Sequence, residues 1–125
     1  MDIDQKPEIT VPDTAPPSTL QVDDLVVGDG PEAGPGMVVT VDYVGTAWST
    51  GQEFDASWNR NDTLSFNLGG GQVIAGWDQG VAGMKVGGRR QLTIPPDMGY
   101  GAAGAGGVIG PNETLLFVVD LRGLG

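Results

Sequence analysis

The fold is decided by the stretch Gln72-Val-Ile-Ala-Gly-Trp-Asp-Gln-Gly-Val-Ala-Gly-Met-Lys-Val-Gly87, the only segment of the chain with helical spacing. Ile74, Trp77 and Val81 follow one another at i, i+3 and i+7, which places them on one face of a helix. Gly76, Gly80 and Gly83 weaken the helix, because each costs about 1 kcal/mol relative to alanine in a helix interior. The pattern therefore predicts one short helix, of roughly two to three turns, that ends near Gly83.

Alternating apolar and polar residues, the pattern of half-buried strands, occupy much of the remaining sequence. In the clearest case Val39, Val41 and Tyr43 share one face, and the residues between them share the other. The last such segment has apolar residues on both faces, which predicts a central place in the sheet. Strands are expected over residues 20–27, 37–48, 64–68, 88–94 and 114–121. Five strands and one short helix make an α+β fold.

The length of 125 residues fits one domain preceded by an arm. Residues 1–18 are rich in proline and acidic residues, and we expect them to form a flexible arm whose main effect is on solubility. Residues 19–125 then form the single domain. Within it, residues 95–113 are expected to be a long loop rich in glycine and proline.

The charge of the chain limits its partners. The formal net charge is −10, and the first 32 residues hold eight of the 16 acidic residues. This sign disfavours nucleic acids and anionic membranes as partners. No segment is long and apolar enough to span a bilayer, and the sequence shows no secretory signal. We expect a cytoplasmic protein that acts as a monomer.

The chain contains no Cys and no His. Their absence removes the commonest general base, thiolate chemistry and the usual ligands of zinc. The acidic residues lack the spacing of a calcium loop, so neither a metal nor a cofactor is expected. Residues 99–104 match the dinucleotide-binding pattern Gly-x-Gly-x-x-Gly by letter, but no strand leads into them and no helix follows them. A nucleotide site is therefore given little weight.

A set of aromatic and branched residues is spread across the expected strands, the helix and the long loop. Its members are Tyr43, Phe54, Phe66, Trp77, Tyr100, Ile109 and Phe117. One interpretation is the core of a small domain, where most large apolar residues lie. The other is a small apolar pocket lined by aromatic rings with a few polar groups. Composition alone favours the core and leaves both interpretations open.

Several motifs resemble the FK506-binding protein family of peptidyl-prolyl cis/trans isomerases. They are the helical stretch above, Val41-Asp-Tyr-Val-Gly45, Phe54-Asp-Ala-Ser57, Phe66-Asn-Leu-Gly69, Leu92-Thr-Ile-Pro-Pro96, Tyr100-Gly101, Gly107-Val-Ile109 and Thr114-Leu-Leu-Phe117. The similarity covers about residues 20–125 in unbroken order and leaves the arm outside. It implies an antiparallel half-barrel sheet around the helix. It also implies a site for proline-containing peptides and unfolded proteins that binds macrolides of the FK506 and rapamycin type.

The resemblance also implies which residues act. Those that would form the catalytic pocket are Tyr43, Phe54, Asp55, Trp77, Tyr100 and Phe117. Those that would contact the substrate or a macrolide around it are Arg60, Phe66, Val73, Ile74, Val108 and Ile109. Trp77 would receive the proline ring, while the Tyr100 hydroxyl and the Ile74 backbone N–H would orient substrate carbonyls. Asp55 would lie at the rim, held by Tyr43 and Arg60.

The sequence departs from the family pattern at Leu64, where similar chains often have an aromatic residue, and at Ala105-Gly106, where they have a bulkier pair. These changes concern the preference for substrate and macrolide more than the activity. Two other classes of function stay open at this point. The chain could be a binding module that keeps the pocket without turnover, or a structural domain without a ligand.

Overall fold

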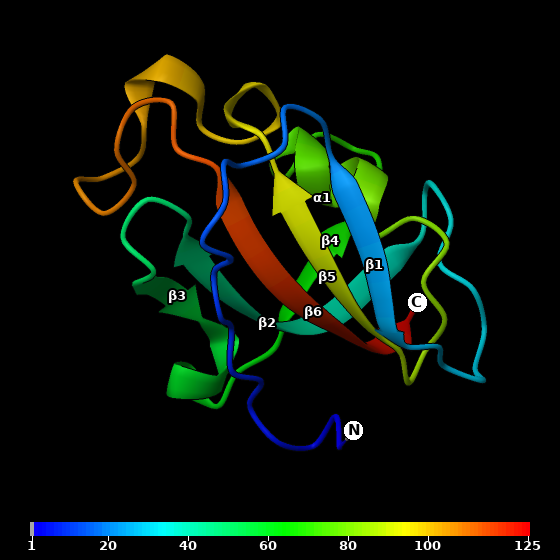
Figure 1. Cartoon of the computed structure of the whole chain (residues 1–125). Helices are drawn as coiled ribbons and strands as arrows, with labels where there is room; N and C mark the ends of the chain where they lie inside the picture. Colours follow the sequence, from blue (N-terminus) through cyan, green and yellow to red (C-terminus); the bar gives the residue numbers. More distant parts are fainter. Residues whose placement is uncertain (1) are drawn as a thin grey trace.

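A six-stranded antiparallel sheet that curves around one short helix forms the structure, a computed structural model that describes residues 2–125 (Figure 1). The strands are β1 (Gln21–Val26), β2 (Val38–Ala47), β3 (Glu53–Ala56), β4 (Leu64–Asn67), β5 (Arg89–Ile94) and β6 (Leu115–Leu124). The helix is α1 (Ala75–Gly80), and the 3-10 turns are η1 (Ser57–Arg60), η2 (Pro96–Met98) and η3 (Gly101–Ala103). The predicted α+β class and the antiparallel sheet wrapped around one short helix are confirmed.

The strand order is β1-β5-β6-β2-β3, and β4 also pairs with β2. Strand β6 lies in the middle, as its two apolar faces predict. One edge of the long strand β2 pairs with β6, and β4 and β3 share the other edge. The sheet has six strands instead of the expected five because Glu53–Ala56 pairs with Val44–Thr46. Four residues that include an aspartate are too short a pattern to mark a strand.

The core fills the side of the sheet that faces α1. Strands β2 and β6 alternate, and their inward residues, such as Val39, Val41, Leu115 and Leu121, have no exposed surface. Burial of apolar side chains on this scale is the main source of stability for a domain of this size. The sheet therefore forms a rigid wall around the helix.

Two glycines set how closely the helix lies against the sheet. A Cβ at Gly76 would come within 2.6 Å of the Ile94 side chain, and a Cβ at Gly80 within 2.7 Å of Leu92. Both distances are far below van der Waals contact. The glycines that weaken the helix locally are thus required for its packing on β5.

The N-terminal arm lies along the opposite side of the sheet, where Figure 1 draws it in blue. Pro7, Ile9 and Val11 are half-buried, and the residues between them are exposed. The indole Nε1 of Trp48 also donates to the Thr14 carbonyl at 3.2 Å. The division of the chain at residue 18 and the flexibility of the arm stay predictions. Among residues 2–125, no helix has the length and apolar character that crossing a membrane requires.

Candidate active site

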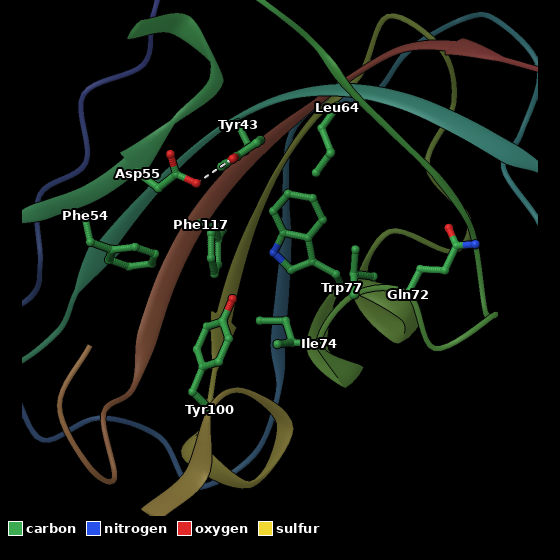
Figure 2. A pocket seen from close by; sticks show the side chains of 10 residues that line it. Tyr43, Phe54, Asp55, Leu64, Gln72, Ile74, Trp77, Tyr100 and Phe117 are labelled. Atoms are coloured by element: carbon green, nitrogen blue, oxygen red, sulfur yellow. Dashed lines mark hydrogen bonds between the residues drawn. The ribbon is translucent and has the colours of Figure 1, made fainter. Parts of the chain in front are cut away.

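A hollow of about 390 Å³ opens between the concave side of the sheet, the start of α1 and the long loop. Figure 2 shows its lining residues, which are Tyr43, Phe54, Asp55, Leu64, Gln72, Val73, Ile74, Trp77, Tyr100 and Phe117. The volume lies within the range of small-molecule sites, and the lining is mostly apolar. The hollow can therefore hold a ring and its neighbouring amides against mostly apolar side chains.

The floor of the pocket is the indole of Trp77, which is only 4% exposed. Its ring lies 5.0 Å from that of Tyr43 and 5.2 Å from that of Phe117, both nearly perpendicular to it, and 5.7 Å from that of Phe66. Edge-to-face pairs at these distances are favourable beyond the area they bury. The indole Nε1 has no hydrogen-bond partner among the described residues. The indole is therefore held by ring packing on several sides, with one face left to the hollow.

Local sequence explains why the rings can converge here. Gly45 lies in β2 behind two of them, and a Cβ at this position would meet Phe117 at 2.6 Å and Phe54 at 2.7 Å. On the other side, the Asp78 carboxylate accepts from the N–H groups of Gly69 (2.9 Å) and Gly71 (3.0 Å). This holds the glycine turn that leads from β4 to the pocket edge. The glycine and the carboxylate both shape the hollow from outside it.

The rim carries the only charged cluster of the pocket within residues 2–125. The Tyr43 hydroxyl donates to Asp55 Oδ2 at 2.5 Å, and Arg60 donates to Asp55 Oδ1 at 2.6 Å and to the Tyr43 hydroxyl at 2.8 Å. Burial raises the pKa of Asp55, but the hydrogen bonds from Tyr43 and Arg60 outweigh it and hold that pKa below its ordinary value. Burial and the Asp55 carboxylate raise the pKa of Tyr43. Asp55 therefore stays ionised and Tyr43 stays protonated at neutral pH.

The Tyr100 hydroxyl and the Ile74 N–H are two donors at the edge of the pocket that have no partner within residues 2–125. The Tyr100 hydroxyl points toward the hollow in Figure 2, and that side chain is 39% exposed. The Ile74 N–H precedes the first turn of α1 and donates to no backbone or side-chain acceptor. Donors of this kind, at the edge of an apolar hollow, suit the carbonyl groups of an extended peptide.

The structure brings eight of the twelve expected site residues into the lining itself. They are Tyr43, Phe54, Asp55, Val73, Ile74, Trp77, Tyr100 and Phe117. The other four lie nearby in different ways. Phe66 is buried against the indole, Ile109 is buried in the core, and Arg60 binds the rim from outside. Val108 is 64% exposed and does not line the hollow.

Two lining residues were not among the expected site residues. Leu64 lies beside the indole in Figure 2, at the position noted above as a departure from the family pattern. Gln72 lies at the edge, where its Oε1 accepts from the Asn67 N–H at 2.9 Å and its amide end points away from Trp77. Leu64 stands out in the sequence only as a departure from the family pattern, and Gln72 has no chemical signal in the sequence because its place depends on the turn that follows β4.

The chemistry available to the pocket is limited to binding and orientation. Among residues 2–125, no group of three or more acidic residues is placed to hold a metal ion. No serine, threonine or lysine lines the hollow, and the single carboxylate is already paired. The lining therefore supports a reaction in which no covalent bond to the protein forms.

Comparison with known proteins assigns this architecture to a class. The chain belongs to the FKBP-type peptidyl-prolyl cis-trans isomerase family, whose family model matches residues 30–122. The family resemblance inferred from the sequence is thereby confirmed. Members of the family are peptidyl-prolyl cis-trans isomerases, and membership implies this class of reaction for the chain.

Individual relatives place the chain more closely. It is 60% identical over 118 residues to an FK506-binding protein of Streptomyces anulatus, which covers 94% of this chain and 95% of the relative. A match of that length includes part of the arm. The chain is also 54% identical over 104 residues to an FK506-binding protein of Neisseria meningitidis. That match covers 82% of this chain and 94% of the relative. Among solved structures, that of AtFKBP13 superposes with a TM-score of 0.79 at 42% identity, covering 88% and 96%.

Proposed function

We propose that this protein accelerates cis/trans rotation about Xaa-Pro bonds in peptides and folding proteins by binding the twisted amide in the Trp77 pocket. The observation that carries the proposal is the position of the indole at the bottom of an apolar hollow with free donors at its edge. Family membership supports the reaction class. The catalytic roles of the lining residues are part of this proposal.

The physical basis is differential binding of two amide geometries. Resonance keeps an Xaa-Pro bond planar and gives a rotation barrier of about 18–20 kcal/mol. The twisted amide has lost that resonance and much of its charge separation, so a dry apolar site holds it better than the planar form. A ten-thousandfold acceleration needs only about 5.5 kcal/mol of such preference. No nucleophile is required, in agreement with the lining.

The polar groups then act as positioning groups. The Tyr100 hydroxyl and the Ile74 N–H donate to carbonyls on either side of the proline, and the indole receives the ring. Asp55, paired with Arg60 and Tyr43, keeps the rim in one arrangement. Holding a substrate in a reactive geometry supplies part of the acceleration without proton transfer.

Macrolide binding is the second part of the proposal. Several relatives carry FK506 in their names, and the apolar lining of the hollow suits the apolar part of such a ligand. Leu64 offers a smaller surface beside the indole than an aromatic ring does. Because a macrolide and a peptide would occupy the same hollow, we expect FK506 and rapamycin to bind in competition with peptide substrates.

One experiment separates the candidate functions. The purified protein is expected to speed cis/trans exchange in a Leu-Pro-Phe test peptide at least a hundredfold above the uncatalysed rate at micromolar enzyme, and FK506 is expected to inhibit it. FK506 binding without turnover would identify a binding module. An absence of both would leave only a structural domain and would contradict the proposal.

The pH dependence of the proposed activity follows from the ionisable groups at the rim, Asp55 and Tyr43. Because the pKa of Asp55 is lowered, its ionised form persists as pH falls and is lost only below its ordinary value of about 3.9. The raised pKa of Tyr43 keeps the phenol protonated beyond its ordinary value of about 10. We expect kcat/KM to stay within about twofold from pH 5 to pH 9. A titration with a midpoint near pH 6 to 8 would contradict these assignments.

We propose further that the partners are proline-containing peptides and unfolded proteins, and that the protein binds neither nucleic acid nor membranes. We also propose that it is a monomer located in the cytoplasm. The net charge of −10 supports the exclusion of nucleic acid. Sedimentation of the purified chain measures the oligomeric state.

A further inference from the structure

The segment that forms the pocket rim, residues 53–60, has two faces. Phe54 and Asp55 line the pocket, whereas Glu53 and Asn59 bind the N-terminal arm on the other side. The backbone of the segment pairs with β2 alone, through three residue pairs whose register shifts, and the buried Ser57 hydroxyl adds hydrogen bonds to Tyr43 and Asp42 of β2. A short edge strand with so few pairings has little local stability of its own. Contacts that hold Glu53 and Asn59 therefore add to those of the rim cluster in holding the wall of the pocket.

Lys6 in the arm holds both of these residues. Its Nζ lies 2.9 Å from Glu53 Oε1 and donates to Asn59 Oδ1 at 3.0 Å. The Asn59 amide in turn donates to Glu53 Oε2 at 3.0 Å, which closes a ring of three side chains. Burial raises the pKa of Glu53, but the hydrogen bonds from Lys6 and Asn59 outweigh it and hold that pKa below its ordinary value. The ring is therefore charged at neutral pH.

The backbone next to Lys6 is itself anchored. Arg89 donates to the Gln5 carbonyl at 2.8 Å, and Arg122 donates to the Ile3 carbonyl at 2.6 Å. Both arginines lie on the outer face of the sheet, where aspartates of the sheet bind their guanidinium groups. These anchors bring the Lys6 ammonium to one place beside β3 and lower the entropy cost of forming the ring.

The conformation of the arm agrees with docking rather than with free movement. Pro7 and Ile9 are half-buried, and Glu8 and Thr10 between them are exposed. This alternation is that of an extended chain with one face against a surface. It continues directly from Lys6, so the ring of side chains is part of a longer contact.

We propose that Lys6 is a positioning residue for the pocket: it anchors Glu53 and Asn59 and thereby holds β3 and η1, with the rim residues they carry. Lys6 does not line the hollow, so it acts through the segment and not on the substrate. The kinetic consequence rests on the proposed isomerase function, whereas the structural consequence does not.

The test is Lys6→Met in the full chain, which removes the charge and keeps most of the length. We expect amide hydrogen exchange in residues 53–62 to quicken about two- to fivefold, with exchange in β6 unchanged. We expect the KM for a Xaa-Pro peptide to rise about two- to fivefold with kcat nearly constant, because a looser rim weakens binding before it affects rotation. The size is limited because both partners are partly exposed.

Three variants serve as controls. Lys6→Arg keeps the charge and is expected to leave both the hydrogen-exchange rates and the KM close to those of the wild-type chain. Glu8→Gln changes an exposed neighbour in the arm and is expected to alter neither. Glu53→Gln added to Lys6→Met is expected to cause little further change, because the shared contact is already lost.

The outcomes distinguish the two proposals. Unchanged exchange and unchanged KM in Lys6→Met would overturn the role of Lys6. Faster exchange spread evenly over the sheet would also overturn it, because that pattern means a general loss of stability. A wild-type chain without isomerase activity would refute the proposed function, and the exchange data would still decide whether Lys6 orders the rim.

Discussion

Trp77→Ala is expected to lower kcat/KM by tenfold or more and to reduce the free energy of unfolding by about 3–5 kcal/mol. The indole is both the floor of the pocket and a buried part of the core, in contact with the rings of Tyr43, Phe66 and Phe117. Its removal opens the hollow to water, which favours the planar, more polar amide over the twisted one. The measurement is isomerase kinetics beside urea unfolding of the same preparation.

A milder variant separates the effect on catalysis from the effect on folding. Trp77→Leu retains an apolar floor and most of the buried volume, and it is expected to stay folded while kcat/KM falls about tenfold. Trp48→Leu makes the same change outside the pocket, where the indole only donates to the arm, and should leave kcat/KM within about twofold. A folded Trp77→Leu protein with wild-type kinetics would show that the flat ring has no part in the reaction.

The elements that local sequence predicts well are those whose pattern repeats over many residues. The ten-residue strand β2 alternates over its first half, β6 is apolar on both faces over most of its length, and the short helix carries the helical spacing that starts at Ile74. Strand β3 could not be predicted in this way. Its four residues pair with the end of β2 across a short turn, and Glu53 contacts the distant arm, but four residues are too few to show the period of a strand.

Some features of the candidate site can likewise be predicted from the sequence, and others cannot. The aromatic residues are visible as a set, but only the family resemblance indicates that they surround a hollow instead of filling it. The rim cluster of Tyr43, Asp55 and Arg60 joins residues up to 17 positions apart, and no periodicity links them. Gln72 enters the lining because a turn held by Asp78 directs the chain there, which is tertiary information.

In the arm, composition and burial pattern point in different directions. Proline and acidic residues predict a weakly ordered segment, and that composition outweighs the alternation of Pro7, Ile9 and Val11. The alternation becomes meaningful only beside a surface with donors for the arm's carbonyl groups. Arg89 and Arg122 provide those donors, although their positions in the sequence mark them only as strand residues.

Arg89→Met is expected to lower the free energy of unfolding by about 3–5 kcal/mol, the largest effect on stability outside the pocket. Arg89 is 2% exposed, and its guanidinium binds Asp120, which has no exposed surface, through Nε at 2.6 Å and Nη2 at 2.9 Å. The substitution leaves a buried carboxylate without this partner, which costs more than the pair itself contributes. Urea denaturation monitored by tryptophan fluorescence measures the change.

The double variant Arg89→Met/Asp120→Leu tests that explanation, because it removes both charges and leaves no isolated one. It is expected to recover most of the lost stability, since buried ion pairs exchange for apolar residues at little cost. Arg60→Gln breaks the exposed rim pair, in which the Arg60 side chain is 50% exposed, and should cost less than about 1 kcal/mol. If the double variant is no more stable than Arg89→Met, the loss comes from packing and from the freed Gln5 carbonyl, and the burial of an unpaired charge does not explain it.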